Sequence, residues 1–494
     1  MRLLPGFALA LALVCADASA ADGRWTMVRG QDMTVVGDQP AATLRDIAER
    51  LERFRAGISG LIPNAERPLP VPTVVFVFGT RKAMQPFLPL TRNGKAAPLG
   101  GFFHRDADVN YIALSLEGFD ESLPVVFHEY THLLVRNAVR SVPVWLNEGL
   151  AEYYSTFTMA GNVVSVDVGR PIVSHVRLLR ERYMPISDLI AIDAGSELYD
   201  EAVRRSIFYA ESWALIHYLM VEVPDGPASI NRYVADIAGG RRPGDAFFDA
   251  FGMSPQKFDE QLKRYVAHPT FRWRTFNLAE RVRVDVSDQG RALSAGEADA
   301  WLGDLQRRIR RKREAAVRIE AALRQDSEAA ITHLALGLLR IDEGRISESW
   351  PALERAVAIA PDDFMTQYAY GASLLREAAQ VDGLVADATA LAHSQTALRA
   401  ATTINPYASE AWSWLAYANM LDDDQLPAAE EAINHAIELA PGRLEYRLRW
   451  ADISILRGHV ADARKLLTEL AAVTTDRTVS DAAQRRLDAL ARSR

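Results

Sequence analysis

Cysteine is almost absent from this 494-residue chain, whose one cysteine is Cys15. Because Cys15 lies in an amino-terminal segment with the features of an export signal, we expect the mature chain to contain no thiol. A chain without thiols cannot form disulfides, and it cannot hold a metal ion through thiolate sulfur. Any metal site would therefore have to use histidine nitrogens and carboxylate oxygens.

Long hydrophobic runs are also missing, apart from one at the start of the chain. A basic residue precedes an apolar stretch from Leu3 to Val14, and Ala18–Ala20 follows as a small-residue cleavage site. The stretch is too short to cross a bilayer comfortably. We therefore expect residues 1–20 to be a cleaved signal peptide, and the mature protein to be periplasmic or secreted without a transmembrane segment. Lipid attachment at Cys15 is less favoured, because a valine precedes it where a lipoprotein signal needs a small residue.

Charge of one sign is not gathered in long acidic blocks. The net charge is −8 and charged residues make up 24% of the chain, which is typical of a soluble globular protein. This balance gives no reason to expect nucleic acid as a partner. The basic run over residues 307–313 is the exception, and its helical context favours a solvated helix face over a binding patch. At 494 residues the chain is too long for one ordinary core, so two or more domains are expected.

The chemistry-bearing side chains concentrate in the motif HEYTH, which covers residues 128–132. Residues four apart share one face of a helix, so His128 and His132 can direct their imidazoles at one cation. Glu129 lies beside the first of them, where it can act as a general base on a water at that cation. The flanking residues are apolar and indicate a buried helix, in which histidines and carboxylates need partners to offset their desolvation. The pattern predicts a zinc ion, and the alternative is a pair of core histidines.

A second acidic segment follows at residues 145–153. Glu148 comes sixteen positions after His132, which leaves room for a turn and a return helix that carries a third ligand. Glu152 is four positions further on, so it can lie behind the metal and accept a hydrogen bond from the second ring N–H of a ligating histidine. A solvated helix position is the alternative for Glu152. Together these segments predict Zn²⁺ bound by His128, His132 and Glu148, with one side open to water and substrate.

These two segments resemble the gluzincin branch of metallopeptidases, in which HExxH is completed by a glutamate from an NExxA/D helix. Asn147, Glu148 and Ala151 match that helix. More narrowly, residues 70–265 are similar to bacterial peptidase MA-like metallohydrolases. The resemblance implies an α+β, thermolysin-like zincin catalytic domain, which we place over residues 21–280.

The resemblance also bears on how a substrate would be held. Gluzincins use a donor from a later helix to stabilise the oxyanion, and Tyr209 is the candidate here; an ordinary packed tyrosine is the alternative. No GAMEN-type strand precedes HExxH, which argues against recognition of a free amino terminus. Residues 110–114 are expected to form an edge strand that could pair with an extended substrate backbone. His175 and His217 receive no role.

The carboxy-terminal part repeats with a period of 34 residues. Gly303, Gly337 and Gly371 are spaced by this period, and two further copies follow an insertion near 378–391. A 34-residue helix–turn–helix unit with small residues at fixed positions is typical of tetratricopeptide (TPR) repeats. We expect an all-α solenoid of about five repeats over residues 296–474, closed by a capping helix over 475–494.

The combined interpretation is an exported zinc metallopeptidase. Zinc would polarise a peptide carbonyl, a water activated by Glu129 would attack it, and Tyr209 would stabilise the oxyanion. Glu129 would then pass the proton to the leaving amine. The TPR array, which has no chemistry of its own, would recruit a peptide or protein substrate or a protein partner. The competing hypothesis is a TPR adaptor whose peptidase-like domain binds metal but is inactive, and hydrolysis of a non-peptide amide is a third.

Overall fold

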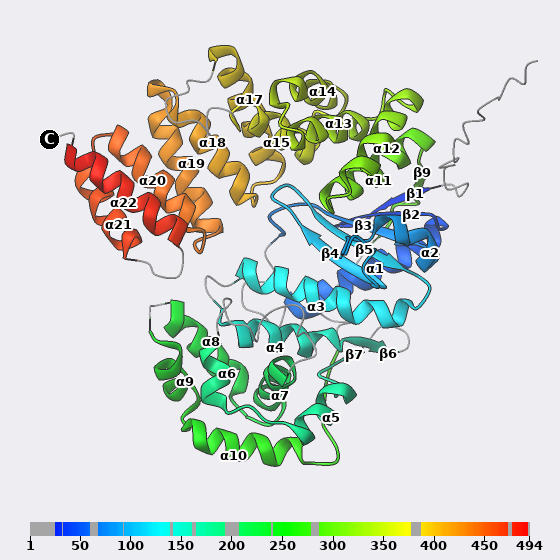
Figure 1. The fold of residues 1–494 in the computed structure, drawn as a ribbon, viewed down its shortest axis with the longest axis vertical. Coiled ribbons are helices and arrows are strands. Elements are labelled where there is room, and N and C mark those ends of the chain that lie inside the picture. The colour runs from blue at the N-terminus through cyan, green and yellow to red at the C-terminus, as the bar shows by residue number, and fades with distance from the viewer. Residues whose placement is uncertain are drawn as a thin grey trace, which may run out of the picture.

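The computed structural model describes most of the chain after the expected signal. The described residues are 25–31, 33–59, 68–91, 93–138, 142–160, 165–192, 207–238, 241–277, 286–376, 387–472 and 477–492. The expected signal peptide over residues 1–20, Cys15 with it, and most of the insertion near 378–391 lie outside these ranges. An amino-terminal sheet with its helices is followed by an all-helical array (Figure 1).

A six-stranded mixed sheet occupies the amino-terminal part, with the strand order β4-β5-β3-β2-β1-β9. β3 pairs in parallel with β2 and β5, whereas β4 is antiparallel to β5 and β1 is antiparallel to β2 and β9. The strands are β1 (Thr26–Arg29), β2 (Met33–Gly37), β3 (Thr73–Phe78), β4 (Gly101–Arg105), β5 (Asn110–Ser115) and β9 (Arg291–Ala292).

The expectation of an edge strand over residues 110–114 is wrong. β5 lies inside the sheet, where Ala113 is opposite Phe76 of β3 on one side and Phe102 of β4 on the other. Every residue of β5 is buried, as is typical of a strand in a sheet that is covered on both faces. β4 is the edge strand instead, and it becomes exposed toward Arg105.

Helices cover both faces of this sheet. Ile112 and Leu114 of β5 pack in one core with α1 (Ala41–Ser59) and α3 (Phe119–Ala138). Tyr111 and Ala113 of the same strand belong to the core of the opposite face, which includes the helical array. Successive side chains of a strand point to opposite faces, so each inner strand serves both cores. The short α2 (Arg81–Met84) and η1 (Gln85–Phe87) lie with the array side.

A helical lobe, defined here as α4–α10, lies on the far side of α3 from the sheet (Figure 1). Its central helix α7 is apolar on all sides and almost wholly buried, as expected of a core helix. A small antiparallel sheet with the order β6-β7-β8 borders the lobe. The elements are α4 (Val144–Ser155), β6 (Thr158–Ala160), β7 (Ser165–Val168), α5 (Val173–Glu181), α6 (Ile186–Ala191), α7 (Ile207–Val221), α8 (Gly226–Ala238), α9 (Pro243–Phe251), α10 (Pro255–Val266) and β8 (Arg274–Asn277).

In the described residues, the carboxy-terminal part is an all-α array of five helix pairs and a final helix, as the 34-residue period predicts. Gly303, Gly337 and Gly371 fall where the two helices of a pair touch: a Cβ on each would meet Ile319, Leu353 and Leu398 at 2.6, 2.5 and 2.7 Å. The pairs are α11 (Ala295–Arg308) with α12 (Lys312–Gln325), α13 (Ala330–Asp342) with α14 (Ile346–Ile359), α15 (Phe364–Ser373) with α17 (Ala388–Ile404), α18 (Ser409–Met420) with α19 (Leu426–Leu439), and α20 (Leu444–Leu456) with α21 (Val460–Ala471). The final helix is α22 (Arg477–Arg492), and η4 (Asp423–Gln425) joins α18 to α19.

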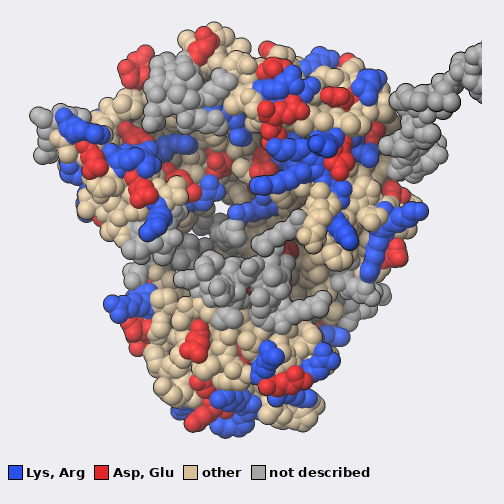
Figure 2. Space-filling view, viewed as in Figure 1, with Lys and Arg blue, Asp and Glu red and all other residues tan. Residues whose placement is uncertain are grey.

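The array is not tethered beside the sheet but packs on it as a third layer (Figure 1). The ring of Trp301 in α11 lies edge-on to Phe76 of β3, with centroids 6.5 Å apart. Further along, Asn405 Nδ2 donates to the Pro70 carbonyl at 3.2 Å. On the face shown in Figure 2, acidic and basic side chains both occur over the array and the lobe. None of the helices in the described ranges combines the length and apolarity that a bilayer crossing needs.

The basic run over residues 307–313 is not the solvated helix face that its composition suggested. Arg307 and Arg308 are the last residues of α11 in the first repeat and are buried, at 7% and 5% exposure. Arg308 donates to Asp304 and Asp106 at 2.8 and 2.7 Å and makes a two-bond contact with Asp108, both bonds 2.7 Å long. We call this group, completed by Asp342 at 2.8 Å from Arg307 and by the Tyr111 hydroxyl on Asp304, the Arg308 cluster.

Candidate metal centre

Two consecutive helices bring the histidines and the glutamates together. α3 and α4 pack against each other, with the HExxH motif on α3 and the NExxA motif on α4. α3 begins at Phe119, so Pro124 lies in its second turn. α4 begins directly after Pro143, which cannot continue a preceding helix. The sequence thus sets the two motifs on separate rigid helices.

The ligand atoms of His128, His132 and Glu148 converge on one point. The two Nε2 atoms are 3.1 Å apart, and Glu148 Oε2 is 3.3 Å from His128 Nε2 and 3.4 Å from His132 Nε2. All three ligand atoms lie within 4.8 Å of one another. Two imidazole nitrogens and a carboxylate oxygen form the donor set of a zinc site with three protein ligands. The residues present therefore fit a zinc ion, and they do so without any thiolate.

The electrostatics of this group show what the carboxylates do to the histidines. Burial by itself lowers the pKa of His128, but the contact with Glu148 and the charges of Glu152, Glu148 and Glu129 outweigh it, so the net pKa is raised. Burial would raise the pKa of Glu148, yet His128 and His132 hold it well below its usual range. Glu148 is therefore ionised, although only 3% of its surface is exposed. The centre attracts positive charge.

Glu152 lies behind the three ligand residues and touches two histidines. One carboxylate oxygen is 3.6 Å from His128 Nδ1, and the other is 3.4 Å from His175 Nε2. Burial would raise the pKa of Glu152, but His175 and His128 lower it to a net value below the usual one. His175, in α5, received no role from the sequence, because it lies 23 positions beyond Glu152 and belongs to neither motif.

Glu129 and Tyr209 occupy different surroundings. Glu129 is next to His128 on α3 and is partly exposed, and its charge contributes to the raised pKa of His128. Tyr209 lies in α7 at 4% exposure, with its ring edge-on to Phe208 at 5.4 Å. The structure thus sets Glu129 beside the first ligand residue and Tyr209 in the buried helix behind α4.

The helix α7 supports the ligand helix α4 through a close contact at Gly149. A Cβ at Gly149 would lie 2.4 Å from the backbone oxygen of Ser212 and 2.6 Å from Ile216 Cγ1. Only glycine lets the two helices approach this closely next to Glu148. On the same helix, His217 Nε2 lies 2.5 Å from the Gly169 carbonyl and Nδ1 lies 2.6 Å from the Tyr265 hydroxyl. These bonds hold His217 in the core, away from any ligand role.

The region with these residues matches one family model, described as "Protein of unknown function (DUF1570)", over residues 122–235. The match contains the ligand candidates together with Glu129, Glu152, His175 and Tyr209, but it covers less than a quarter of the chain. That description names no activity. No curated protein matches the chain.

The chain is similar to several solved structures, two of which are described as TPR proteins. MamA from Desulfovibrio magneticus RS-1 is 18% identical, with a TM-score of 0.30, and the match covers 35% of this chain and 92% of that one. YrrB, "a TPR protein with an unusual peptide-binding site", is 16% identical, with a TM-score of 0.32 and coverages of 38% and 91%. TTC0263, a thermophilic TPR protein in Thermus thermophilus, is 16% identical, with a TM-score of 0.30 and coverages of 40% and 98%. The assignment of repeats to this chain rests on its own 34-residue period and helix pairs.

Proposed function

We propose that this chain is an exported zinc-dependent metallopeptidase of the gluzincin type. The observation that carries the proposal is the convergence of His128, His132 and Glu148 at 3.1 to 3.4 Å, with Glu129 on the same helix as the two histidines. Three largely shielded groups that can each donate a lone pair lie close together, and a cation is a ligand that all three can bind. The α+β arrangement around them suits a thermolysin-like domain.

The chain's own side chains have separate tasks in the proposed reaction. Zinc, when bound, supplies a Lewis acid for the scissile carbonyl group. Glu129 takes up the proton of the attacking water and delivers it to the leaving amine. The hydroxyl of Tyr209 donates a hydrogen bond to the oxyanion that develops on the carbonyl oxygen. Glu152, whose Oε1 lies 3.6 Å from Nδ1 of His128, would favour the tautomer of His128 that leaves the lone pair of Nε2 free for the metal.

An extended substrate would add to the edge of the sheet at β4. β4 packs on α3, and within the described residues its only strand neighbour is β5. Its outer backbone groups can therefore pair with a peptide in the direction of the HExxH helix. In the proposal β4, rather than residues 110–114, pairs with the extended substrate backbone. Recognition of an extended backbone, with no amine-binding motif, favours cleavage inside a chain.

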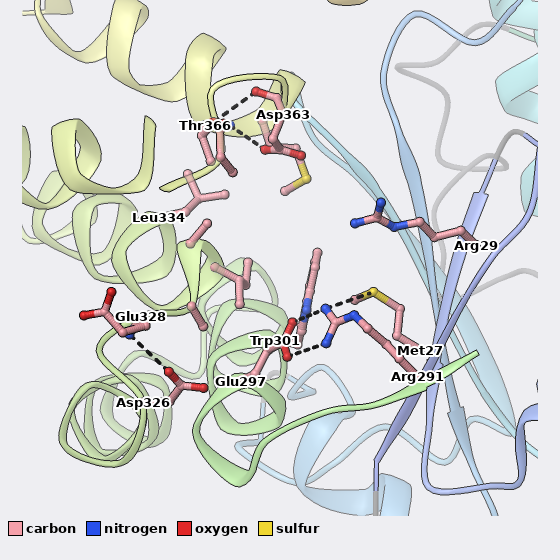
Figure 3. Close-up of a pocket in the computed structure, with 15 residues that line it drawn as sticks. Met27, Arg29, Arg291, Glu297, Trp301, Asp326, Glu328, Leu334, Asp363 and Thr366 are labelled. Carbon is pink, nitrogen blue, oxygen red and sulfur yellow. Dashed lines mark hydrogen bonds and ion pairs between the residues drawn. The ribbon is translucent and has the colours of Figure 1, made fainter. Parts of the chain in front are cut away.

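The array would present the substrate or a protein partner. Residues at one repeat position, 297, 331 and 365, turn toward β1 and β9 and line a pocket of about 440 Å³ between the sheet and the first three repeats. Trp301 and Leu334 supply apolar wall, and Arg29 of β1 reaches toward the pocket from the opposite side (Figure 3). A peptide segment with mixed apolar and charged side chains suits this lining.

The test compares wild type with Glu129→Gln on a mixed peptide library, with zinc content measured on the same samples. We expect the variant to retain zinc and to lose hydrolysis by roughly 10²–10⁴-fold, because a general base contributes about that much. Glu181→Gln, at an exposed position of α5, is the matched control and should cleave like wild type. His128→Ala should lose the metal itself.

The second candidate function, a TPR adaptor with an inactive metal-binding domain, is favoured by how the array is built into the fold. Its first repeats share a core with the sheet, so it can position a bound protein rigidly without any reaction. Wild type that contains zinc but cleaves no peptide in the library would support the adaptor. Cleavage that survives Glu129→Gln would contradict the proposed mechanism.

A further inference from the structure

We propose that His175 is a positioning residue of the metal centre, which acts on zinc affinity through Glu152 and His128. The inference rests on zinc binding at this centre, and it does not depend on which bond the protein cleaves. The proposal rests on two successive side-chain contacts that join three helices. His175 of α5 contacts Glu152 of α4 at 3.4 Å, and Glu152 contacts His128 of α3 at 3.6 Å.

Each oxygen of the Glu152 carboxylate serves a different histidine. Oε1 faces Nδ1 of His128, and Oε2 faces Nε2 of His175. A carboxylate that is held at both oxygens cannot rotate without losing one contact. Its fixed orientation keeps the proton of His128 on Nδ1, so that Nε2 presents its lone pair to the metal. His175 therefore fixes the ring of a ligand residue that it does not touch.

The low solvent exposure of these side chains strengthens the contacts between them. The side chains of His128, Glu152 and His175 are only 14%, 17% and 15% exposed, so solvent screens them weakly. His175 Nε2 is shielded from solvent and forms no hydrogen bond within the described residues, and its polar contact is the ion-pair distance of 3.4 Å to Glu152 Oε2. Its ring lies 6.0 Å from that of Trp213 in α7, which holds α5 against the core of the lobe.

The two candidate ligand histidines differ in whether Nδ1 faces a carboxylate. Nδ1 of His132 is buried and has no hydrogen-bond partner within the described ranges, whereas Nδ1 of His128 faces Glu152. His175 can therefore influence the orientation of the His128 ring through Glu152, but it has no such route to the His132 ring. Removing His175 should loosen Glu152, let the His128 ring turn, and weaken the metal site while leaving all three ligands in place.

The experiment measures the zinc dissociation constant of the full mature chain by competition with a chromogenic chelator. We expect His175→Ala to weaken zinc binding by roughly 10-fold, the lower end of the 10–100-fold that loss of a direct outer partner such as Glu152 costs, because His175 acts on His128 only through Glu152. His175→Gln, whose amide N–H can still donate to Glu152, should stay within about threefold of wild type. His333→Ala, at a partly exposed histidine of the array, is the matched control and should leave zinc affinity unchanged.

A double-variant comparison separates positioning from packing. In a Glu152→Ala background, adding His175→Ala should change zinc affinity no further, because Glu152, through which His175 acts on His128, is already absent. Unchanged affinity in His175→Ala alone would overturn the proposal, and so would equal weakening by His175→Ala and His175→Gln. If wild type bound no zinc, the proposed function would fail instead. Zinc binding without peptide cleavage would leave this test intact.

Discussion

The Arg308 cluster and the candidate metal centre, which is the group of His128, His132, Glu148 and Glu152, are both shielded groups of charged side chains, and they differ in how their charges are balanced. In the Arg308 cluster each guanidinium meets carboxylates, as Arg308 does with Asp304, Asp106 and Asp108. In the metal centre, Glu148 and Glu152 meet only histidines in the contacts described above. Burial of charge is common to both. In the contacts described, the second group contains no arginine or lysine, and this difference supports the proposal that it binds a cation.

The two groups also connect different parts of the molecule. The Arg308 cluster joins β5 and the turn before it to the first repeat, so its contacts hold the array on the sheet. The metal centre joins α3, α4 and α5 on the other side of the sheet. One group should therefore set the stability of the layered fold without affecting the metal. The other should set metal affinity with a smaller effect on stability.

The largest effect is expected from Arg308→Ala. Removing the guanidinium leaves Asp304 and Asp108 buried without their main counter-charge, which typically costs roughly 3–5 kcal/mol of unfolding free energy. Zinc affinity should stay at the wild-type value, because the ligand helices are untouched. Urea unfolding and chelator competition measure the two quantities. Arg313→Ala, an exposed member of the same basic run, is the control and should change stability by less than about 0.5 kcal/mol.

Zinc removal should give the next largest effect. A ligand that binds only the folded state stabilises it by about 2.7 kcal/mol when present at 100 times its Kd. A chelator should lower the unfolding free energy of wild type by about this amount, and it should do the same to Arg308→Ala. His128→Ala should not respond to the chelator. An equal response in His128→Ala would show that the metal acts elsewhere.

Two features of the fold could be predicted from the sequence because short-range patterns encode them. HExxH requires only one helix to place His128 and His132 on one face, and Glu148 requires one more helix. The 34-residue period of Gly303, Gly337 and Gly371 reports a contact that recurs within each helix pair. Such local rules need no knowledge of the distant parts of the chain.

Other features could not be predicted, because they depend on contacts between distant segments. Residues 110–114 have the composition of a strand, but only pairing with β4 and β3 decides that the strand is interior. Arg308 looks like a surface residue until Asp108, two hundred positions away, is placed beside it. His175 lies outside both motifs, and only the packing of α5 on α7 brings it to Glu152.

The smallest effect concerns His217, a third buried polar group whose hydrogen bonds are complete. Burial lowers the pKa of His217 to about 4, and the bond to the Gly169 carbonyl offsets only part of this. In the unfolded chain its pKa is about 6.5, so the folded protein disfavours the charged ring. The stability contribution is therefore complete above pH 6.5 and is lost as the pH falls toward 4. Between pH 7 and pH 5 the loss is about 2 kcal/mol.

His217→Gln should remove this pH dependence. The deficit in unfolding free energy of His217→Gln relative to wild type should therefore be smaller at pH 5 than at pH 7 by that amount. All other ionisable groups are common to the two proteins, so their contributions cancel in the difference. Parallel stability curves for the two proteins would contradict a neutral, structural His217.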